Sequence, residues 1–456
     1  MKIFSKKFWK IVYVVIFMLA LILPGMWTFV GSQKIIGNEE EVDFSDVGYL
    51  NVSDKVDRYM NQKFGFRNKL VNLYNGIKYQ VFSEGGNNQV IVGKDDWLFF
   101  ASALSDYNGQ DLLTDAEIDK IARILSMVQK NVEDKGGKFL FVSAPNKMEI
   151  YGEYMPYYHI EYSGDGNYEK LFLRLDDIGV NNVDLKELLK SEKVNRDYLI
   201  YYKTDSHWND LGAAIAYENI MKYLNKDYIE LSDSYEIIYN AYKSDLDKMI
   251  FPDKEPSEDI VKFEHEFNFY YTSNYRGAND LVIQTANGDK TDNLIMWRDS
   301  FGEALYYMFA ENFNTAEFRR EIPYNMSAVK ENDVVIIELV ERNLSYLLWQ
   351  LPIIVAQETE IEADENVNVK PEILVENKNG FKLISAKVEN IPSDCLNVYF
   401  RVDTEGEEKI FEAYPSAADG DTCIYLEEIS EKAEISIIYE FEGKIYETLK
   451  NSINCV

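Results

Sequence analysis

Apolar and polar positions in the middle of the chain alternate between helical and strand spacing. From Thr114 to Val132 apolar residues recur every three or four positions, and Thr114 with Glu117 forms a capping-box pattern, which together predict a helix. Two glycines follow, and the apolar run 138–143 beyond them is typical of a strand buried on both faces. The alternation continues less regularly, with predicted strands at 198–202, 294–296 and 334–339 and predicted helices at 211–224 and 301–313. Strands that alternate with helices require crossover connections, so the sequence predicts a parallel sheet with helices on both faces.

Other regions lie outside this alternation. Residues 90–100 form a strand-like run, and residues 235–292 resemble an insertion of loops and short strands. Near the C-terminus short alternating runs predict a small β-sandwich at 366–456, joined by a linker at 357–369. The main α/β domain is therefore expected at 35–356.

The segment 11–33 carries no charged residue and is long enough, at about 1.5 Å per residue, to cross about 30 Å of hydrocarbon. Lysines precede it and acidic residues follow it. The positive-inside rule therefore places residues 1–10 in the cytoplasm as a tail and everything beyond the segment outside the cell. We expect a transmembrane anchor at 11–33 and a single-pass protein of the cell membrane with an extracellular catalytic domain. A cleaved signal peptide fits less well, because Trp27, Phe29 and Val30 are bulky where small residues should precede a cut.

The composition is that of an ordered globular chain, with 456 residues that are 46% hydrophobic and 27% charged. A formal net charge of −31 repels phosphates, so no nucleic-acid partner is expected. Residues 357–456 hold 23 acidic and 9 basic side chains, a net charge of −14, so the C-terminal region is especially acidic. With three Cys and three His, neither a metal centre nor a cofactor is expected. Outside the cell Cys395 and Cys423 could pair and leave Cys455 as an odd thiol, or all three could be thiols.

Two segments at the ends of predicted strands carry reactive side chains. Asp205 and His207 lie two positions apart, so extended backbone projects both to the same side. Ser300 follows the predicted strand 294–296 and opens the next helix, where backbone N–H groups favour a negative oxygen. A hydroxyl, an imidazole and a carboxylate are the three parts of acyl transfer by a serine nucleophile. Taken singly each motif is weak, because a helix-opening serine is ordinarily an N-cap and Asp-x-His arises by chance.

Counting the histidines strengthens the case for His207. His159 lies in a tyrosine-rich loop and His265 in a charged run, and neither has a nucleophile at a strand end beside it. Both are expected on the surface. A metal site on the Asp-x-His pattern would need a third ligand from elsewhere in the chain.

A series of sequence blocks occurs in a fixed order within residues 55–345. They are 64–67 (FGFR), 93–99 (GKDDWLF), 144–151 (APNKMEIY), 155–156 (MP), 204–208 (TDSHW), 298–302 (RDSFG) and 340–344 (VERNL). Together these blocks resemble the alginate O-acetyltransferase family, also called DHHW proteins, a permuted relative of the SGNH hydrolases. The chain departs from the family at position 206, where it has a serine in place of the His or Thr that the family has there and after which it is named.

This resemblance implies an SGNH-like α/β domain, here preceded by one transmembrane helix and followed by a small β-sandwich. It implies transfer of an acetyl group, through an acyl-serine intermediate, to hydroxyls of an exopolysaccharide or cell-wall glycan. Asp205, His207 and Ser300 are the catalytic triad that it implies. The implied partner is a multispanning membrane acyltransferase that supplies acetyl groups.

Further candidates are polar groups near predicted strand ends. The backbone N–H of Ser300 and the side chains of Asn146 and Arg298 are candidate oxyanion donors. Lys147 and Arg342 either hold a substrate carboxylate or form structural ion pairs. The predicted function is a membrane-anchored extracellular O-acetyltransferase. A carbohydrate acetylesterase of the same fold would use the same residues, and a non-catalytic polysaccharide-binding or assembly scaffold is the alternative from another class.

Overall fold

The computed structural model describes residues 6–30, 55–57, 59, 67–389, 391–392, 394–404, 406–415 and 421–454. Predictions that concern residues 1–5, 31–33, 64–66 and Cys455 lie outside the described residues.

A seven-stranded sheet in the order β4-β3-β11-β9-β10-β8-β7 forms the centre of the main domain. Neighbouring strands from β4 to β10 run parallel, whereas β8 is antiparallel to β10 and β7 to β8. The strands are β3 (Lys138–Ala144), β4 (Asn182–Val183), β7 (Tyr270–Tyr271), β8 (Val282–Ala286), β9 (Asn293–Trp297), β10 (Thr315–Arg319) and β11 (Val334–Val340). The predicted strand at 198–202 is wrong, because Tyr201 makes only an isolated bridge with Trp208 across a tight loop.

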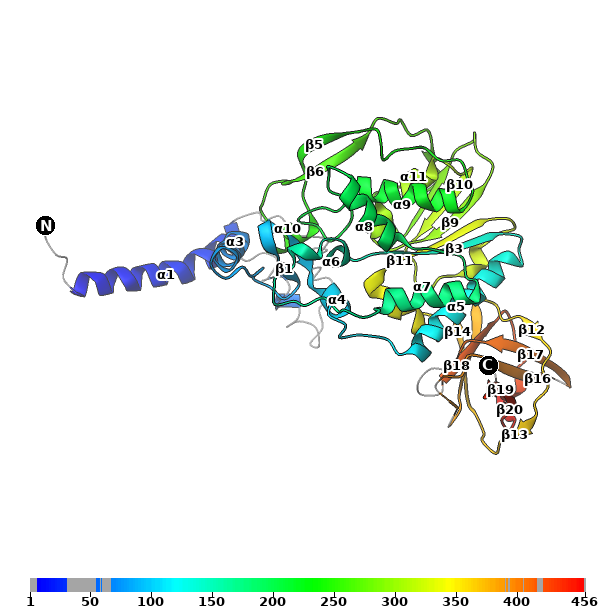
Figure 1. The fold of residues 1–456 in the computed structure, drawn as a ribbon. Coiled ribbons are helices and arrows are strands. Elements are labelled where there is room, and N and C mark those ends of the chain that lie inside the picture. The colour runs from blue at the N-terminus through cyan, green and yellow to red at the C-terminus, as the bar shows by residue number, and fades with distance from the viewer. Residues whose placement is uncertain are drawn as a thin grey trace.

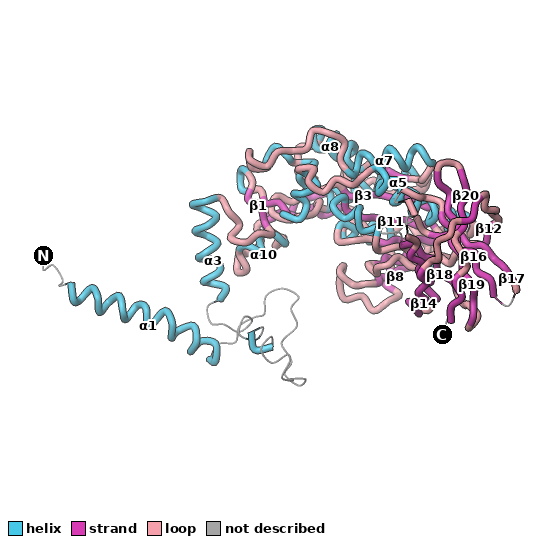
Figure 2. The backbone as a smooth tube through the Cα atoms, turned by 90° about the horizontal axis from the view of Figure 1, so that it is seen from below, coloured by secondary structure: helices cyan, strands magenta, loops and turns pink. Residues whose placement is uncertain are grey.

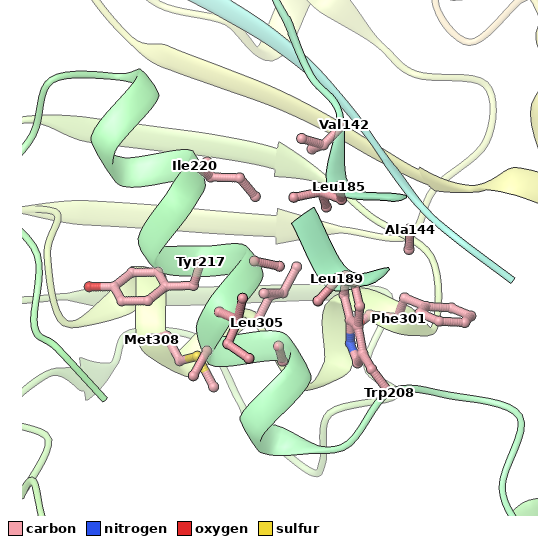
Figure 3. Packing of buried hydrophobic residues seen from close by; sticks show 14 of the residues in the cluster. Val142, Ala144, Leu185, Leu189, Trp208, Tyr217, Ile220, Phe301, Leu305 and Met308 are labelled. Carbon is pink, nitrogen blue, oxygen red and sulfur yellow. The ribbon is translucent and has the colours of Figure 1, made fainter. Parts of the chain in front are cut away.

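Helices cover both faces of this sheet, as the alternation predicted (Figure 1). Successive residues of β3 show how, since Leu140 and Val142 belong to one core and Phe139 and Phe141 to the other. The first core is covered by α8 (Leu185–Asn195), α9 (Asp210–Tyr223) and α11 (Tyr306–Ala310), and the second by α5 (Asp115–Glu133) and α7 (Asn167–Ile178). Figure 3 shows the first core, with Val142 beside Leu185.

The predicted helix after Thr114 is confirmed as α5, with its capping box formed in both directions. The predicted helix at 301–313 is broken, because a 3-10 turn at the carboxyl edge of the sheet separates its start from α11. The 3-10 helices are η2 (Lys94–Asp96), η3 (Ala101–Ala103), η4 (Gly152–Tyr154), η5 (Phe301–Glu303), η6 (Met326–Ala328) and η7 (Glu341–Leu348).

The segment predicted to span a membrane forms part of α1 (Lys6–Val30), which begins among the N-terminal lysines. Within the described part of the chain, no helix combines the length and the apolar character that crossing a membrane requires. The structure therefore gives the predicted transmembrane anchor at 11–33 no support. The next described helices are α3 (Arg67–Ile77) and the π-helix η1 (Lys78–Phe82).

The segment 235–292 folds back over the carboxyl edge of the sheet. It contains β5 (Tyr235–Tyr242), α10 (Asp245–Ile250) and β6 (Glu258–Phe263) before β7 and β8 join the main sheet. Leu246 and Ile250 of α10 are fully buried against the hairpin of β1 (Val90–Val92) and β2 (Leu98–Phe100). Two short helices, α4 (Leu104–Tyr107) and α6 (Lys147–Ile150), complete this edge.

The C-terminal region is built of β-strands, in agreement with the predicted β-sandwich, and gathers at the end of the molecule opposite α3 (Figure 2). One sheet has the order β12-β17-β16-β19-β20-β13 with β21 paired to β19, and a three-stranded sheet has the order β14-β15-β18. The predicted linker carries β12 (Glu358–Thr359) and β13 (Glu365–Asn366). The remaining strands are β14 (Glu372–Lys378), β15 (Phe381–Lys387), β16 (Val398–Thr404), β17 (Glu407–Ala413), β18 (Asp421–Leu426), β19 (Lys432–Phe441), β20 (Lys444–Glu447) and β21 (Asn451–Asn454).

Contacts between the C-terminal region and the main domain are apolar and ionic. Leu383, Tyr414 and Tyr425 are buried in the same core as α5, and Arg123 of α5 forms an ion pair with Glu412 of β17. Cys395 and Cys423, for which pairing was one of two alternatives, are thiols rather than a disulfide.

Candidate active site

The structure brings Ser300, His207 and Asp205 together at the carboxyl edge of the sheet. Ser300 follows β9 and is the N-cap of η5. Asp205 and His207 lie in the loop that ends where Trp208 pairs with Tyr201, just before α9. His207 Nε2 is 2.8 Å from Ser300 Oγ, and His207 Nδ1 is 2.7 Å from Asp205 Oδ1. This is the order hydroxyl, imidazole, carboxylate that activates a serine nucleophile.

Aromatic side chains fasten the histidine loop to the serine turn. The indole Nε1 of Trp208 donates to the carbonyl oxygen of Phe301 at 3.0 Å. The Phe301 ring lies 4.8 Å from the His207 ring and 5.2 Å from the Trp208 ring, between centroids. Trp208 and Phe301 lie together at the edge of the core in Figure 3. Because both are fully buried, this contact fixes the separation of His207 and Ser300.

Asp205 is fully buried and is held as an anion by four hydrogen bonds. Its Oδ1 accepts from the backbone N–H and from the ring Nδ1–H of His207. Its Oδ2 accepts from Tyr242 Oη at 3.0 Å and from the Asp245 N–H at 2.8 Å. Burial by itself would raise the pKa of Asp205, but the hydrogen bond and charge of His207 and the other donors hold that pKa well below its usual range. A carboxylate that stays ionised orients the imidazole and stabilises its protonated form.

His207 has a raised pKa although most of the ring is covered. Burial is the largest influence and lowers the pKa, but it is outweighed by the hydrogen bond and charge of Asp205 together with the charge of Asp245, while Arg342 opposes them. Between them these groups make His207 a stronger base than an exposed histidine. A stronger base is better able to take the Ser300 proton.

The turn that presents Ser300 is fixed by the neighbouring Asp299. One carboxylate oxygen of Asp299 accepts the Phe301 N–H at 2.8 Å, and the other accepts the Val340 N–H of β11 at 2.8 Å. Gly302 is required by packing, because a Cβ there would lie 2.6 Å from the Cβ of Arg298. Within the described part of the chain the Ser300 N–H has no hydrogen-bond acceptor. It is therefore available to a developing oxyanion, and its role as an oxyanion donor stays a prediction.

The candidate oxyanion side chains are engaged with the protein itself. Asn146 is buried, and its Nδ2 donates to Asp106 at 2.8 Å while its Oδ1 accepts from Arg342 at 3.1 Å. Arg298 donates to the carbonyl oxygens of Asp299 and Ala278 at 3.2 and 2.5 Å. These contacts hold the loops around Ser300, while Arg298 Nε is buried without a hydrogen-bond partner among the described residues. The oxyanion role of Asn146 and Arg298 stays a prediction.

Lys147 holds the loop that carries the acid and the base. Its Nζ donates to the carbonyl oxygens of Tyr202, Lys203 and Asp205 at 3.2, 3.1 and 2.5 Å, and it lies over the Phe99 ring at 5.1 Å. Burial lowers the pKa of Lys147 to about 8. With its donors used on backbone carbonyl oxygens, Lys147 positions the loop that carries Asp205, which is a structural role but differs from the ion pair that was one of the two alternatives. Arg342 lies 5.5 Å from the Phe301 ring, beside the serine turn.

Among the described residues, the side-chain atoms of Asp205, His207 and Asp245 that could bind a metal ion lie within 4.8 Å of one another. Both ring nitrogens of His207 already have hydrogen-bond partners, Nδ1 in Asp205 and Nε2 in Ser300. The group is therefore a hydrogen-bonded set around one imidazole.

Sequence reasoning missed Tyr242 and Asp245. Both lie in the segment 235–292, whose pattern has neither helical nor strand periodicity over more than a few residues. The one local signal is Ser244 before a short acidic stretch, which is typical of a helix N-terminus. That signal says nothing about which distant loop the helix would meet.

Residues 90–249 match the family model of the SGNH hydrolase-like domain of the acetyltransferase AlgX. The resemblance read from the sequence blocks is confirmed by this match, and so is the SGNH-like α/β fold. A probable alginate O-acetylase AlgJ from Pseudomonas putida is 21% identical over 244 residues, which are 52% of this chain and 60% of that protein. The matched region thus spans less than two thirds of the length of that relative.

Solved structures that this chain matches include PatB1 of Bacillus cereus, described with a sulfonyl adduct, at 18% identity and a TM-score of 0.43, covering 56% of this chain and 95% of that one. A DHHW family protein from Eubacterium siraeum is similar at 16% identity and a TM-score of 0.43, covering 57% of this chain and 93% of that one.

Proposed function

We propose that this chain is an O-acetyltransferase that moves an acetyl group, through an acyl-Ser300 intermediate, to hydroxyls of an exopolysaccharide or cell-wall glycan. The observation that carries the proposal is the 2.8 Å contact of His207 Nε2 with Ser300 Oγ while Asp205 holds Nδ1. The AlgX family match and the alginate O-acetylase relative support acetyl transfer as the reaction.

In the first half-reaction His207 takes the Ser300 proton as Oγ forms a bond to the acyl carbon of the donor. The oxyanion that results is stabilised by the Ser300 N–H. The bond from the acyl carbon to the donor then breaks, and the leaving group takes the proton from His207. In the second half-reaction His207 takes a proton from a sugar hydroxyl, whose oxygen displaces Ser300 Oγ and leaves an acetylated glycan. Protonated His207 returns its proton to Ser300.

The partners and the location belong to the same proposal. A polysaccharide is the acceptor, and a multispanning membrane acyltransferase delivers acetyl groups from inside the cell. The catalytic domain acts outside the cell, and protease treatment of intact cells tests this, since an outer domain is digested while a cytoplasmic marker survives.

Hydrolysis is the second candidate reaction, because water can replace the sugar hydroxyl at the acyl-enzyme. A ratio of transferred to hydrolysed acetate measured with and without added oligosaccharide separates the two. A rise in acetylated sugar at the expense of free acetate favours the transferase, and an unchanged acetate yield favours an acetylesterase.

Ser300→Ala tests the catalytic proposal against the binding scaffold. We expect it to lose turnover of an aryl acetate by at least about 1,000-fold while keeping its fold, because the nucleophile is absent. Ser327→Ala, at an exposed hydroxyl in η6, is the matched control and should leave the rate unchanged. Mass spectrometry of the wild-type protein after a brief reaction should find one acetyl group on the peptide that contains Ser300. Unchanged turnover in Ser300→Ala would show that the nucleophile is elsewhere.

A further inference from the structure

A second carboxylate lies on the Nδ1 side of His207. Asp245 Oδ2 is 3.7 Å from Nδ1, and the Ser206 hydroxyl bridges the two, 3.1 Å from Nδ1 and 2.5 Å from Asp245 Oδ2. The other oxygen of Asp245 accepts the Ser206 N–H at 2.9 Å. A serine hydroxyl has one proton and two lone pairs, so Ser206 can donate to Asp245 and still accept. The single Nδ1–H is then shared, with Asp205 Oδ1 at 2.7 Å as its nearer acceptor and Ser206 Oγ at 3.1 Å as its farther one.

We propose that Ser206 and Asp245 form a second hydrogen-bonded arm on His207. The imidazolium created when Ser300 gives up its proton is then stabilised by two carboxylates on its Nδ1 side. This inference rests on the proposed function of Ser300 and His207. The contacts of Asp245 in this site are with Ser206, Asp205 and the His207 ring, so it is a positioning residue that acts through the ring.

The arm is anchored by α10. Leu246 and Ile250 are fully buried against the β1–β2 hairpin, which fixes the start of the helix. There the backbone N–H of Asp245 donates to Asp205 Oδ2 at 2.8 Å, while its side chain reaches Ser206. A single residue therefore orients the buried carboxylate through its backbone and supports the imidazole through its side chain.

The charged groups that face the ring act in opposite directions. Burial lowers the pKa of His207 most strongly, Asp205 and Asp245 raise it, and Arg342 lowers it. Tyr242 of β5 and Lys147 of α6 act on the His207 ring through Asp205. Tyr242 donates to Asp205 Oδ2, and Lys147 donates to the Asp205 carbonyl oxygen. Asp205 gives the larger support to a positive charge on His207, and Asp245 adds a second negative group to it.

Titration of the imidazoles by NMR tests the arm without any turnover. The chain has three histidines, and the His207 signal is assigned by its loss in His207→Gln. We expect Asp245→Asn to lower the pKa of His207 by about half a unit to one unit, because an opposite charge nearby is removed. Ser206→Ala should shift it less. The double variant should shift no further than Asp245→Asn, because the two groups act in series.

The pH profile of kcat/KM for an aryl acetate supplies the second readout. In Asp245→Asn the acid limb should move to lower pH by the same amount, with a several-fold lower kcat and an unchanged KM. Asp245→Glu, which keeps the charge, should restore the limb. Asp233→Asn, at an exposed carboxylate paired with Arg196, is the matched control and should change neither.

The outcomes separate the arm from the catalytic proposal. If the His207 titration and the acid limb stay at their wild-type positions in Asp245→Asn while Ser300→Ala is inactive, the arm is refuted and the proposed function stands. If Ser300→Ala remains active, the proposed function fails, and the titration still decides whether the arm exists. Ser206→Ala removes only the side-chain hydroxyl that bridges His207 and Asp245 and leaves α10 unchanged. This variant decides the question if Asp245→Asn does not fold.

Discussion

Lys186 of α8 is the buried cation of a carboxylate cluster behind the candidate site, and replacing it with methionine gives a sharp test of the electrostatic reasoning. Its Nζ lies 2.5 Å from Glu341, 2.7 Å from Glu169 and 3.5 Å from Glu149, and its side chain is 3% exposed. Glu341 in turn accepts the Asn146 N–H at 2.9 Å. Lys186→Met keeps the apolar stem and leaves three carboxylates without their cation.

The expected loss follows from burial. Removing one partner of a buried ion pair costs about 3–5 kcal/mol, whereas an exposed pair contributes less than about 1 kcal/mol. The matched control is Lys190→Met, on the same helix, because Lys190 is 39% exposed and pairs only with Glu187 at 3.5 Å. The free energy of unfolding should therefore fall several times further in Lys186→Met than in Lys190→Met.

The loss should also grow with pH. Burial and nearby negative charges already raise the pKa of Asp106, at the edge of this cluster, to about 7. Without Lys186 the other carboxyl groups hold their protons more tightly in the folded chain than in the unfolded one. Groups with a raised folded pKa contribute stability that is present below the unfolded pKa of about 4.3 and is lost as pH rises through the folded value. Lys186→Met should thus fall further behind wild type at pH 8 than at pH 5.

Urea unfolding followed by tryptophan fluorescence measures this loss in the main domain, since four of the six tryptophans lie between residues 97 and 349 and none lies in the C-terminal region. Equal destabilisation by Lys186→Met and Lys190→Met would refute the claim that burial sets the value of the cation. A deficit that does not change between pH 5 and pH 8 would refute the role assigned to the carboxylates.

Other parts of the site give shorter predictions. Trp208→Phe removes the hydrogen bond to the Phe301 carbonyl and should lower the free energy of unfolding by about 1–3 kcal/mol, measured with urea. It should also reduce kcat for an aryl acetate, and a wild-type kcat would contradict the positioning role of Trp208. Gly302→Ala should lower turnover at least about tenfold, because the new Cβ would lie 2.6 Å from an arginine Cβ, whereas Gly288→Ala meets nothing within 4 Å and should be silent. Because a base must be neutral and the pKa of His207 is raised, kcat/KM should fall on the acid side with a midpoint above about 6.5, and a midpoint below that value would show that the carboxylates do not control the ring.

The parts of the fold that depend on local pattern were predictable from sequence. The capping box at Thr114 and the mainly apolar runs of β3 and β11 carry their own information, because a strand buried on both faces is apolar at most positions. The buried Glu338 of β11 is an exception to this pattern. The rule that parallel strands end at one edge places Ser300 after β9 at that edge. Asp205 and His207 follow no strand of this sheet, so their meeting with Ser300 was predictable from the family blocks.

What escaped prediction depends on contacts between distant segments. The helix α10 has six residues, too few to show a period, and its apolar side is defined only by the β1–β2 hairpin about 150 positions earlier. In the same way the sequence marks Asn146 and Lys147 as polar residues at a strand end but cannot name their partners. Those partners, a carboxylate at Asp106 and the carbonyl oxygens of residues 202–205, come from other parts of the chain.

The attachment of the acidic C-terminal strands to α5 means that they travel with the reaction centre as one piece. Tyr414 and Tyr425 are part of the core beneath the sheet, and the Arg123–Glu412 ion pair closes its rim. A ligand bound by those strands would consequently be held at a fixed distance and orientation relative to Ser300. A chain truncated at residue 356 would expose the apolar face of α5 that these strands cover. Aggregation of the truncated chain would then result from this exposed surface and not from the loss of an activity.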